Sequence, residues 1–192
     1  FNVKETDLAG NTSNATTNFT VTGDTTAPTV SSVAITSATG IQNNFLNEDD
    51  VVSVTATFSE NVPVTGTPQL TLVVGGTNRT ATYTSGSGST PLVFQYTIQA
   101  GETDSDGISI GANTLALNSG TIKDAAGNDA TITHSSVAAN SSYKVDTTAP
   151  TVSSVAITSA TGIQNNLLNA GDNVSVTATF SKNVPVTGTP QL

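Results

Sequence analysis

A stretch of 47 residues that occurs twice constrains this chain more than any other feature of its sequence. Residues 24–70 recur 122 positions later as residues 146–192, and only five aligned positions differ. The differences are Phe45→Leu167, Glu48→Ala170, Asp49→Gly171, Val51→Asn173 and Glu60→Lys182. A period of this length is that of a whole domain rather than of a solenoid repeat. The sequence therefore predicts tandem copies of one domain.

The offset divides the chain into three expected parts. Residues 24–145 make one complete repeat, long enough to bury a core of its own. Residues 1–23 read as the end of a preceding repeat, because Gly10-Asn11 matches Gly127-Asn128. Residues 146–192 read as the first part of the next repeat. We expect the chain to be a window from a longer repetitive protein, in which near-identical copies serve length or avidity.

The pattern of apolar residues predicts strands throughout. Apolar and polar residues alternate from Val52 to Phe58, so the apolar ones share one face of a strand. Gly75-Gly76 lies between two further apolar runs and predicts a hairpin turn. Other strands are expected at 30–36, 69–74, 79–84 and 92–98, with shorter pieces at 108–110, 115–117, 121–123, 131–133 and 142–145. Many short strands with polar turns indicate an all-β antiparallel sandwich.

The composition of the chain excludes several classes of function. Fourteen acidic residues against five basic ones give a formal net charge of −9, which argues against a nucleic-acid partner. The chain has no cysteine, hence no disulfide or thiol chemistry, and no apolar run of membrane-spanning length. Charged residues make up only 10% of the chain, and a surface of Thr, Ser and Asn suits a secreted protein.

No motif of the sequence indicates catalysis. The one imidazole, His134, adjoins Ser135 and Ser136, but neighbours in sequence do not supply the geometry of a nucleophile and its base. Phosphate-binding loops, zinc spacings and nucleophile elbows are absent from the sequence. We therefore expect a protein that is not an enzyme.

Acidic residues instead gather in predicted loops, and clustered carboxylates with Asn and carbonyl oxygens are what Ca²⁺ requires. One group is the segment 102–107, where Asp104 and Asp106 alternate and Gly follows. The alternative there is a solvated turn closed by Asp-Gly. A second group contains Asp124 and Asn128, and its alternative is a turn in which Asp124 caps backbone amides.

The third group is the aspartate at each repeat boundary, Asp24 and Asp146. An ion at a junction would draw carboxylates from both neighbouring domains and fix the angle between them. Glu48 and Asp49 are replaced in the second copy and are therefore not expected to be indispensable ligands.

Several motifs in order resemble the bacterial Ig-like repeats of giant secreted, RTX-type surface adhesins. They are found at 54–62, 66–70, 99–108, 122–128 and 143–146. The resemblance covers the central repeat and the C-terminal part, whereas residues 1–23 resemble a related Ig-like type. It implies Ig-like antiparallel β-sandwich domains in tandem, forming a stalk on a secreted, cell-anchored protein.

The resemblance also implies calcium at or near domain junctions. Carried onto this sequence, it favours Asp24, Asp124, Asn128 and Asp146 as ligands, with Asp104 and Asp106 as a candidate site within the repeat. The change of Glu60 to Lys182 argues against a ligand role for Glu60, or restricts that role to one copy.

The leading prediction is a non-enzymatic extender whose partners are the neighbouring repeats of the same chain. The alternatives are an adhesive module that binds a ligand, a subunit of a surface filament or layer that contacts other copies, and an appendage beside a secreted hydrolase. An extracellular, cell-surface location is expected for each, with neither nucleic acid nor membrane insertion.

Overall fold

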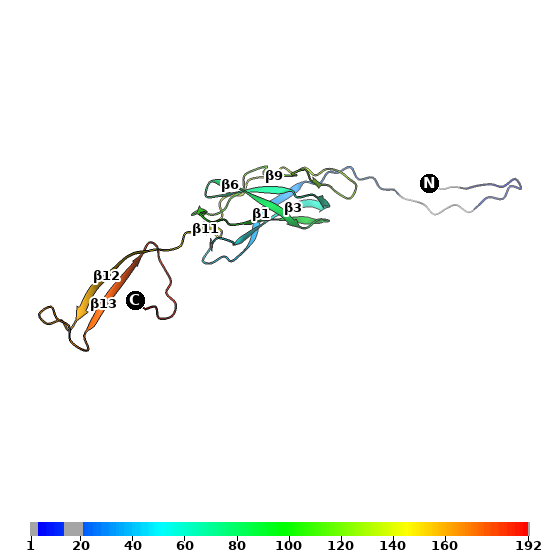
Figure 1. Ribbon diagram of the computed structural model, residues 1–192. Helices are drawn as coiled ribbons and strands as arrows, with labels where there is room; N and C mark the ends of the chain where they lie inside the picture. The colour runs from blue at the N-terminus through cyan, green and yellow to red at the C-terminus, as the bar shows by residue number, and fades with distance from the viewer. Residues whose placement is uncertain (1–3, 14–20, 192) are drawn as a thin grey trace. The chain divides into compact units, whose positions relative to one another are not determined.

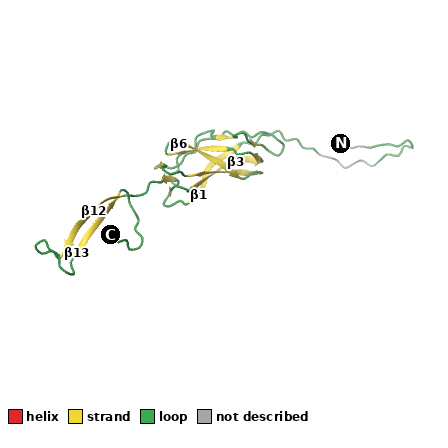
Figure 2. Ribbon diagram, viewed as in Figure 1, coloured by secondary structure: helices red, strands yellow, loops and turns green. Residues whose placement is uncertain are grey.

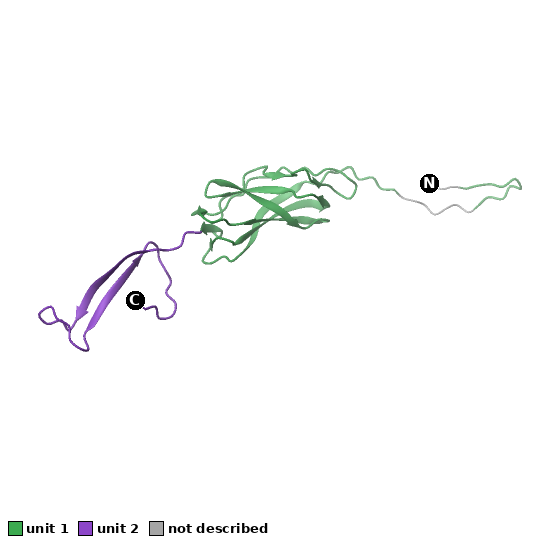
Figure 3. Cartoon of the chain, in the orientation of Figure 1, with its two compact units in different colours: residues 1–146 green, residues 147–192 purple. Residues whose placement is uncertain are grey.

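A computed structural model describes residues 4–13 and 21–191 of the chain. This part of the chain consists of strands, turns and loops (Figure 2). Its contacts separate residues 1–146 from residues 147–192, and the two units are described one at a time (Figure 3). That residues 1–23 end a different repeat stays a prediction, and residues 1–3 and 14–20 of that part lie outside the described residues. Within the described residues there is no helix of the length and apolarity that crossing a membrane requires.

The first unit contains one large sheet and two small ones. Its strands are β1 Val30–Thr39, β2 Phe45–Leu46, β3 Val51–Val62, β4 Val64–Thr65, β5 Gln69–Val74, β6 Thr77–Ser85, β7 Ser89–Thr97, β8 Thr103–Asp104, β9 Leu115–Ala116, β10 Thr121–Ile122 and β11 Lys144–Asp146. The large sheet has six strands in the order β1-β3-β7-β6-β5-β9, all antiparallel (Figure 1). The predicted all-β, antiparallel character is confirmed, and β11 beside β2 is a parallel exception.

Strand β3 is the centre of the core, as the alternation predicted. Its inward residues Val52, Val54 and Ala56 are fully buried and Phe58 is 2% exposed. Strand β7 pairs with β3 and contributes a second buried row, in which Phe94 faces the ring of Tyr83 edge to face at 5.9 Å. Apolar surface removed from water in this way is the main favourable term in folding.

The part of the core supplied by residues 98–146 is less regular than predicted. Leu115 comes from β9 at the edge of the large sheet, and Ile98, Ile108, Ile110 and Ile122 join the same core from short strands and loops. The strands expected at 108–110 and 131–133 are reduced to isolated bridges. Each of these apolar pieces is too short for a continuous ladder, so turns and side-chain hydrogen bonds hold this layer.

The hairpin between β5 and β6 follows the predicted turn. Val74 pairs with Thr77, and Gly75 and Gly76 adopt positive φ angles of 54° and 78°. Two positive φ angles in succession define the hairpin turn whose twist matches that of the flanking strands. A Cβ atom on Gly75 would lie 2.0 Å from the Thr103 carbonyl oxygen, so this position also requires glycine for a close approach.

The second unit repeats the first hairpin of the first unit. Its strands β12 Val152–Thr161 and β13 Asn173–Phe180 pair in the register of β1 and β3, with the same two irregularities. The inward row is identical in sequence, yet Val176 is 43% exposed where Val54 is fully buried, and Phe180 is 39% exposed where Phe58 is 2% exposed. The hairpin therefore forms in both units, and only the first unit covers its apolar face with further strands.

This difference predicts unequal effects for two matched substitutions in the full chain. Phe58→Ala removes a buried ring and should lower the free energy of unfolding of the first unit by about 3–5 kcal/mol. Phe180→Ala removes the equivalent but exposed ring and should leave that free energy unchanged within about 0.5 kcal/mol. Urea titrations monitored by circular dichroism measure the free energy of unfolding of each variant. Equal losses would contradict the assignment of the core to β3.

Candidate metal centre

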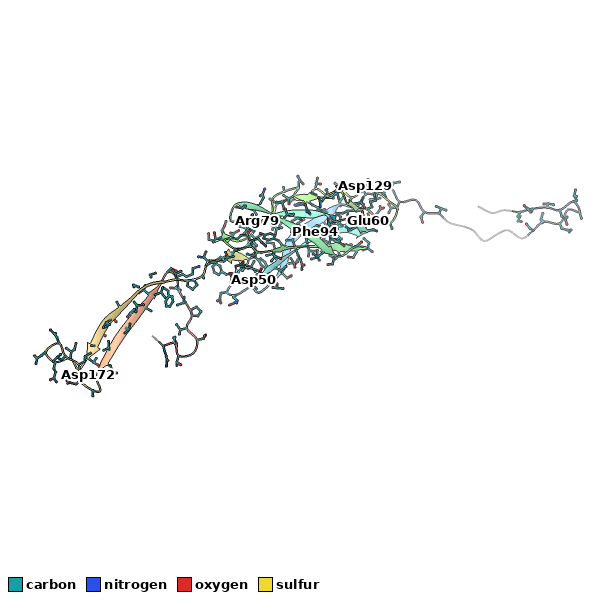
Figure 4. All side chains as sticks on the ribbon, viewed as in Figure 1. Asp50, Glu60, Arg79, Phe94, Asp129 and Asp172 are labelled. Atoms are coloured by element: carbon teal, nitrogen blue, oxygen red, sulfur yellow. The ribbon has the colours of Figure 1, made fainter. Side chains whose placement is uncertain are left out.

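Three carboxylates meet at the end of β3. Glu60 stands near the end of β3, Asp24 precedes β1, and Asp124 follows β10, so three separate elements each supply one side chain. One oxygen atom of each carboxylate lies within 4.8 Å of the others. Asp124 is buried, Glu60 is half-buried and Asp24 is exposed. Figure 4 shows Glu60 and Asp129 at one end of the first unit and Asp50 at the other.

Asp124 is held by the turn that follows it. The backbone N–H of Asn128 donates to Oδ1 of Asp124 at 2.8 Å, and Nδ2 of Asn128 donates to Oδ2 at 2.6 Å. The turn at Asp7 and Asn11 repeats this geometry, with distances of 2.8 and 2.9 Å. The motif is thus a self-contained capped turn, which was the structural alternative to a metal site. Each Asp124 oxygen has a second lone pair, so the turn still leaves the carboxylate able to face a cation.

Asn128 joins the turn to the start of the repeat. Its side-chain amide nitrogen lies 3.2 Å from the Asp24 carbonyl oxygen and 3.5 Å from the Thr26 carbonyl oxygen. The side-chain amide N–H groups of Asn128 therefore donate to oxygen atoms around the triad. Asn128 therefore positions the Asp124 carboxylate and the backbone at Asp24. The sequence predicted that Asn128 is a metal ligand, and its side-chain oxygen could bind a metal here only if the amide group rotated.

The three carboxylates repel one another. Partial burial, and after it the charges of Asp24 and Asp124, raises the pKa of Glu60 above 4.5. Burial also opposes ionisation of Asp124, but hydrogen bonds from the side chain and backbone of Asn128 and from the next backbone amides outweigh it. The pKa of Asp124 consequently lies below its ordinary value of 3.8. No ion pair to these carboxylates is found among the residues of 4–13 and 21–191.

The spacing of this triad fits a metal ion. Oxygen atoms on opposite sides of a calcium ion at 2.3–2.6 Å are about 5 Å apart, so three oxygens within 4.8 Å can share one ion. Oxygen-only donors of this kind suit hard cations. Asp24, Glu60 and Asp124 could therefore hold a metal ion, which would also offset their repulsion.

The segment 102–107 is arranged differently from the predicted site. Glu102 turns inward, where it accepts hydrogen bonds from Tyr96 Oη at 2.6 Å, from the Gln99 backbone N–H at 2.9 Å and from Nε of Arg79. Burial, with the hydrogen bond to Glu102, raises the pKa of Tyr96. This buried carboxylate is thus neutralised by Arg79 and has a structural role.

Asp104 caps two turns. It accepts from the Gly75 backbone N–H at 2.7 Å and from the Gly107 backbone N–H at 2.8 Å, which ties the β5–β6 hairpin to β8. Asp106 is exposed. In the described part of the chain, Asp104 and Asp106 do not join a group of three metal-ligating side chains, whereas Asp24 and Asp124 do.

Asp146 belongs to the end of the unit opposite the triad. It lies in β11 and pairs with Thr103 of β8, while β11 runs beside β2, just before the start of β3. The ten residues from Val51 to Glu60 extend over roughly 30 Å of strand. The predicted ligands therefore divide between two ends, with Asp24, Asp124 and Asn128 together at one of them.

Glu60 is the member of the triad that the sequence argument set aside. Its replacement by Lys182 in the second copy was read as evidence against a ligand. The usable signal was its place on β3: alternation puts Glu60 on the inward face of the strand, between buried Phe58 and buried Val62.

An open groove of about 660 Å³ lies between the first residues of β1 and residues 133–137. His134 lines it, but its Nε2 accepts a hydrogen bond from the Thr114 backbone N–H at 2.9 Å. Its Nδ1 lies 2.9 Å from the Ser135 carbonyl oxygen, to which it donates. Both ring nitrogens are thus engaged by backbone groups, which gives no support to a serine–histidine pair.

Comparison with protein-family models, with curated proteins and with solved structures finds no match to this chain. The resemblance to adhesin repeats accordingly rests on the motifs of the sequence alone.

The lowered pKa of Asp124 predicts a pH dependence. A carboxyl whose pKa falls on folding stabilises the protein above its unfolded pKa, and this contribution disappears as the pH falls through the folded value. Asp124→Asn should therefore lower the midpoint of thermal unfolding at pH 7, and the difference from the unaltered chain should close below about pH 4.

Asp7→Asn is the matched control: hydrogen bonds from the Asn11 side chain and backbone lower the pKa of Asp7 as well, but its turn is exposed throughout and contributes no residue to the core, so it can unfold separately from it. It should leave the midpoint unchanged at both pH values. A loss for Asp124→Asn that persists at pH 2–3 would show that the carboxylate charge is not the cause.

Proposed function

We propose that this chain is a non-enzymatic extender of a bacterial cell-surface adhesin, made of Ig-like β-sandwich repeats that calcium stiffens. One observation carries the proposal: a domain-sized repeat in which both copies form the same opening hairpin in the same register. A chain that adds whole folded domains gains length with each copy, and that is the property a stalk requires.

The fold supports a sandwich repeat. A six-stranded antiparallel sheet supplies most of the core, and residues 98–146 add further buried residues to it from short strands and loops, as expected if they form part of a second layer. The connection from one copy to the next contains Ala149 and Pro150, and proline restricts both its own backbone and that of the residue before it. A short connection with restricted backbone angles allows a narrower range of orientations between neighbouring domains than a glycine-rich connection does.

Calcium is the ion that the triad favours. Its ligands are carboxylates with carbonyl oxygens close by, and Asp24 is the first residue of the repeat. Ca²⁺ accepts six to eight oxygens in flexible geometry, whereas Mg²⁺ demands a near-ideal octahedron. An ion here would fix the start of the repeat against the turn at Asp124, and so would stiffen the entry to the domain.

Thermal unfolding of the full chain with calcium and with chelator tests this proposal. Calcium at 100 times its dissociation constant should stabilise the first unit by about 2.7 kcal/mol, which raises the midpoint by roughly 10 °C. Magnesium at the same concentration should raise it much less.

Two aspartate variants locate the site. Asp24→Asn should remove most of the calcium-dependent rise, while Asp106→Asn, at an exposed acid outside the triad, should keep it. An unchanged midpoint in calcium would refute the metal assignment and leave an extender stabilised by its core alone. A rise lost in Asp106→Asn and kept in Asp24→Asn would place the ion in the segment 102–107.

A further inference from the structure

The two copies place residues 60 and 182 in the same local frame. In the first copy the Thr29 backbone N–H donates to Ser59 Oγ at 3.0 Å, and the Ser59 N–H donates to the Thr29 carbonyl oxygen at 2.9 Å. In the second copy Thr151 and Ser181 form the same two bonds, at 3.0 and 2.8 Å. Glu60 and Lys182 follow directly after these bonded serines, Glu60 within β3 and Lys182 in a bend just beyond β13.

The side chains at this position have opposite charges and reach the same part of the hairpin. Lys182 Nζ donates to the carbonyl oxygen of Thr148 at 2.6 Å. Thr148 is the counterpart of Thr26, whose carbonyl oxygen lies in the first copy beside the Asn128 amide that also bonds Asp24 and Asp124. The ammonium of the second copy thus binds the counterpart of a carbonyl oxygen that, in the first copy, lies beside the acidic triad.

We infer that this position is a cation site which the two copies fill differently. In the first copy Glu60 completes a triad that takes a divalent cation from solution. In the second copy the ammonium of Lys182 is that cation, attached to the chain. The part about the first copy rests on the metal binding of the proposed function, while the part about Lys182 rests on its own contact with Thr148.

Charge balance agrees with this exchange. Three carboxylates with one divalent cation carry one net negative charge, and Asp24 and Asp124 with an ammonium at position 60 would also carry one. An ammonium group donates three hydrogen bonds and accepts none, so carbonyl and carboxylate oxygens serve it as they serve a metal. A first copy with lysine at position 60 would therefore need no dissolved ion at this site.

Glu60→Lys and Glu60→Gln, made separately in the full chain, test the inference. Both remove the repulsion at the triad, but only the lysine variant adds an ammonium. In chelator, the first unit of the Glu60→Gln variant should have a higher melting midpoint than the first unit of the unaltered chain. It should rise by a further 2–5 °C or so in Glu60→Lys, the size expected for a partly exposed ion pair in a domain of this length. Calcium should raise the midpoint of the unaltered chain and leave that of Glu60→Lys unchanged.

A second comparison identifies the partner of the introduced ammonium. In an Asp124→Asn background the advantage of Glu60→Lys over Glu60→Gln should shrink, because coupled neighbours do not add independently. Equal midpoints for the two variants in chelator would overturn the inference, whatever calcium does to the unaltered chain. If calcium has no effect on the unaltered chain but Glu60→Lys exceeds Glu60→Gln, the metal of the proposed function is refuted and the ammonium site is supported.

Discussion

The burial of one face of β3 is the constraint on which the rest of this structure depends. Its inward residues meet β7 and the layer formed by residues 98–146, and its two edges pair with β1 and β7. Because the strand is fixed along its length, its last residues have a fixed direction as well. Glu60 is carried by that end, so the rigid core determines where its carboxylate meets Asp24 and Asp124. Local turns alone could not bring together residues so distant in the chain.

The acidic residues of the first unit are handled in two different ways. Glu102 and Asp104 are buried, and protein groups satisfy them: Arg79 with Tyr96 in one case, two backbone amides in the other. Burying a carboxylate without hydrogen-bond or ion-pair partners costs free energy, and both of these carboxylates have such partners. At the triad the carboxylates face one another, and the pKa of Glu60 is raised first by burial and then by the charges of Asp24 and Asp124. The negative charge of the triad is not neutralised by basic side chains of the described residues, so a cation from solution would stabilise this site more than it would stabilise the site of Glu102 or Asp104.

The sequence allowed the regular part of the fold to be predicted, because alternation identifies a half-buried strand and a glycine pair identifies a tight turn. The inward row of β3 and the β5–β6 hairpin were predicted correctly for this reason. The segment 98–146 was predicted only in part: short strands formed near 115, 121 and 144, but those expected at 108–110 and 131–133 are isolated bridges. Its shape depends on contacts such as that of Asp104 with Gly75, which no local pattern contains. Of the triad, Asp24 was a candidate from its place at the repeat boundary and Asp124 from its turn. Glu60 was discounted because the second copy has lysine there, and its neighbours become visible only once the strands are packed.

The five differences between the copies leave the core untouched. Phe45, Glu48 and Asp49 are exposed and Val51 and Glu60 are half-buried, whereas every inward residue from Val52 to Phe58 is repeated. Three acids are lost and one base is gained, so the second copy is more positive by four charges over the same residues. Surface charge contributes little to the stability of a fold held by apolar burial, and the hairpin register is accordingly the same in both copies. A repeat built in this way can change its demand for cations from one copy to the next without changing its backbone.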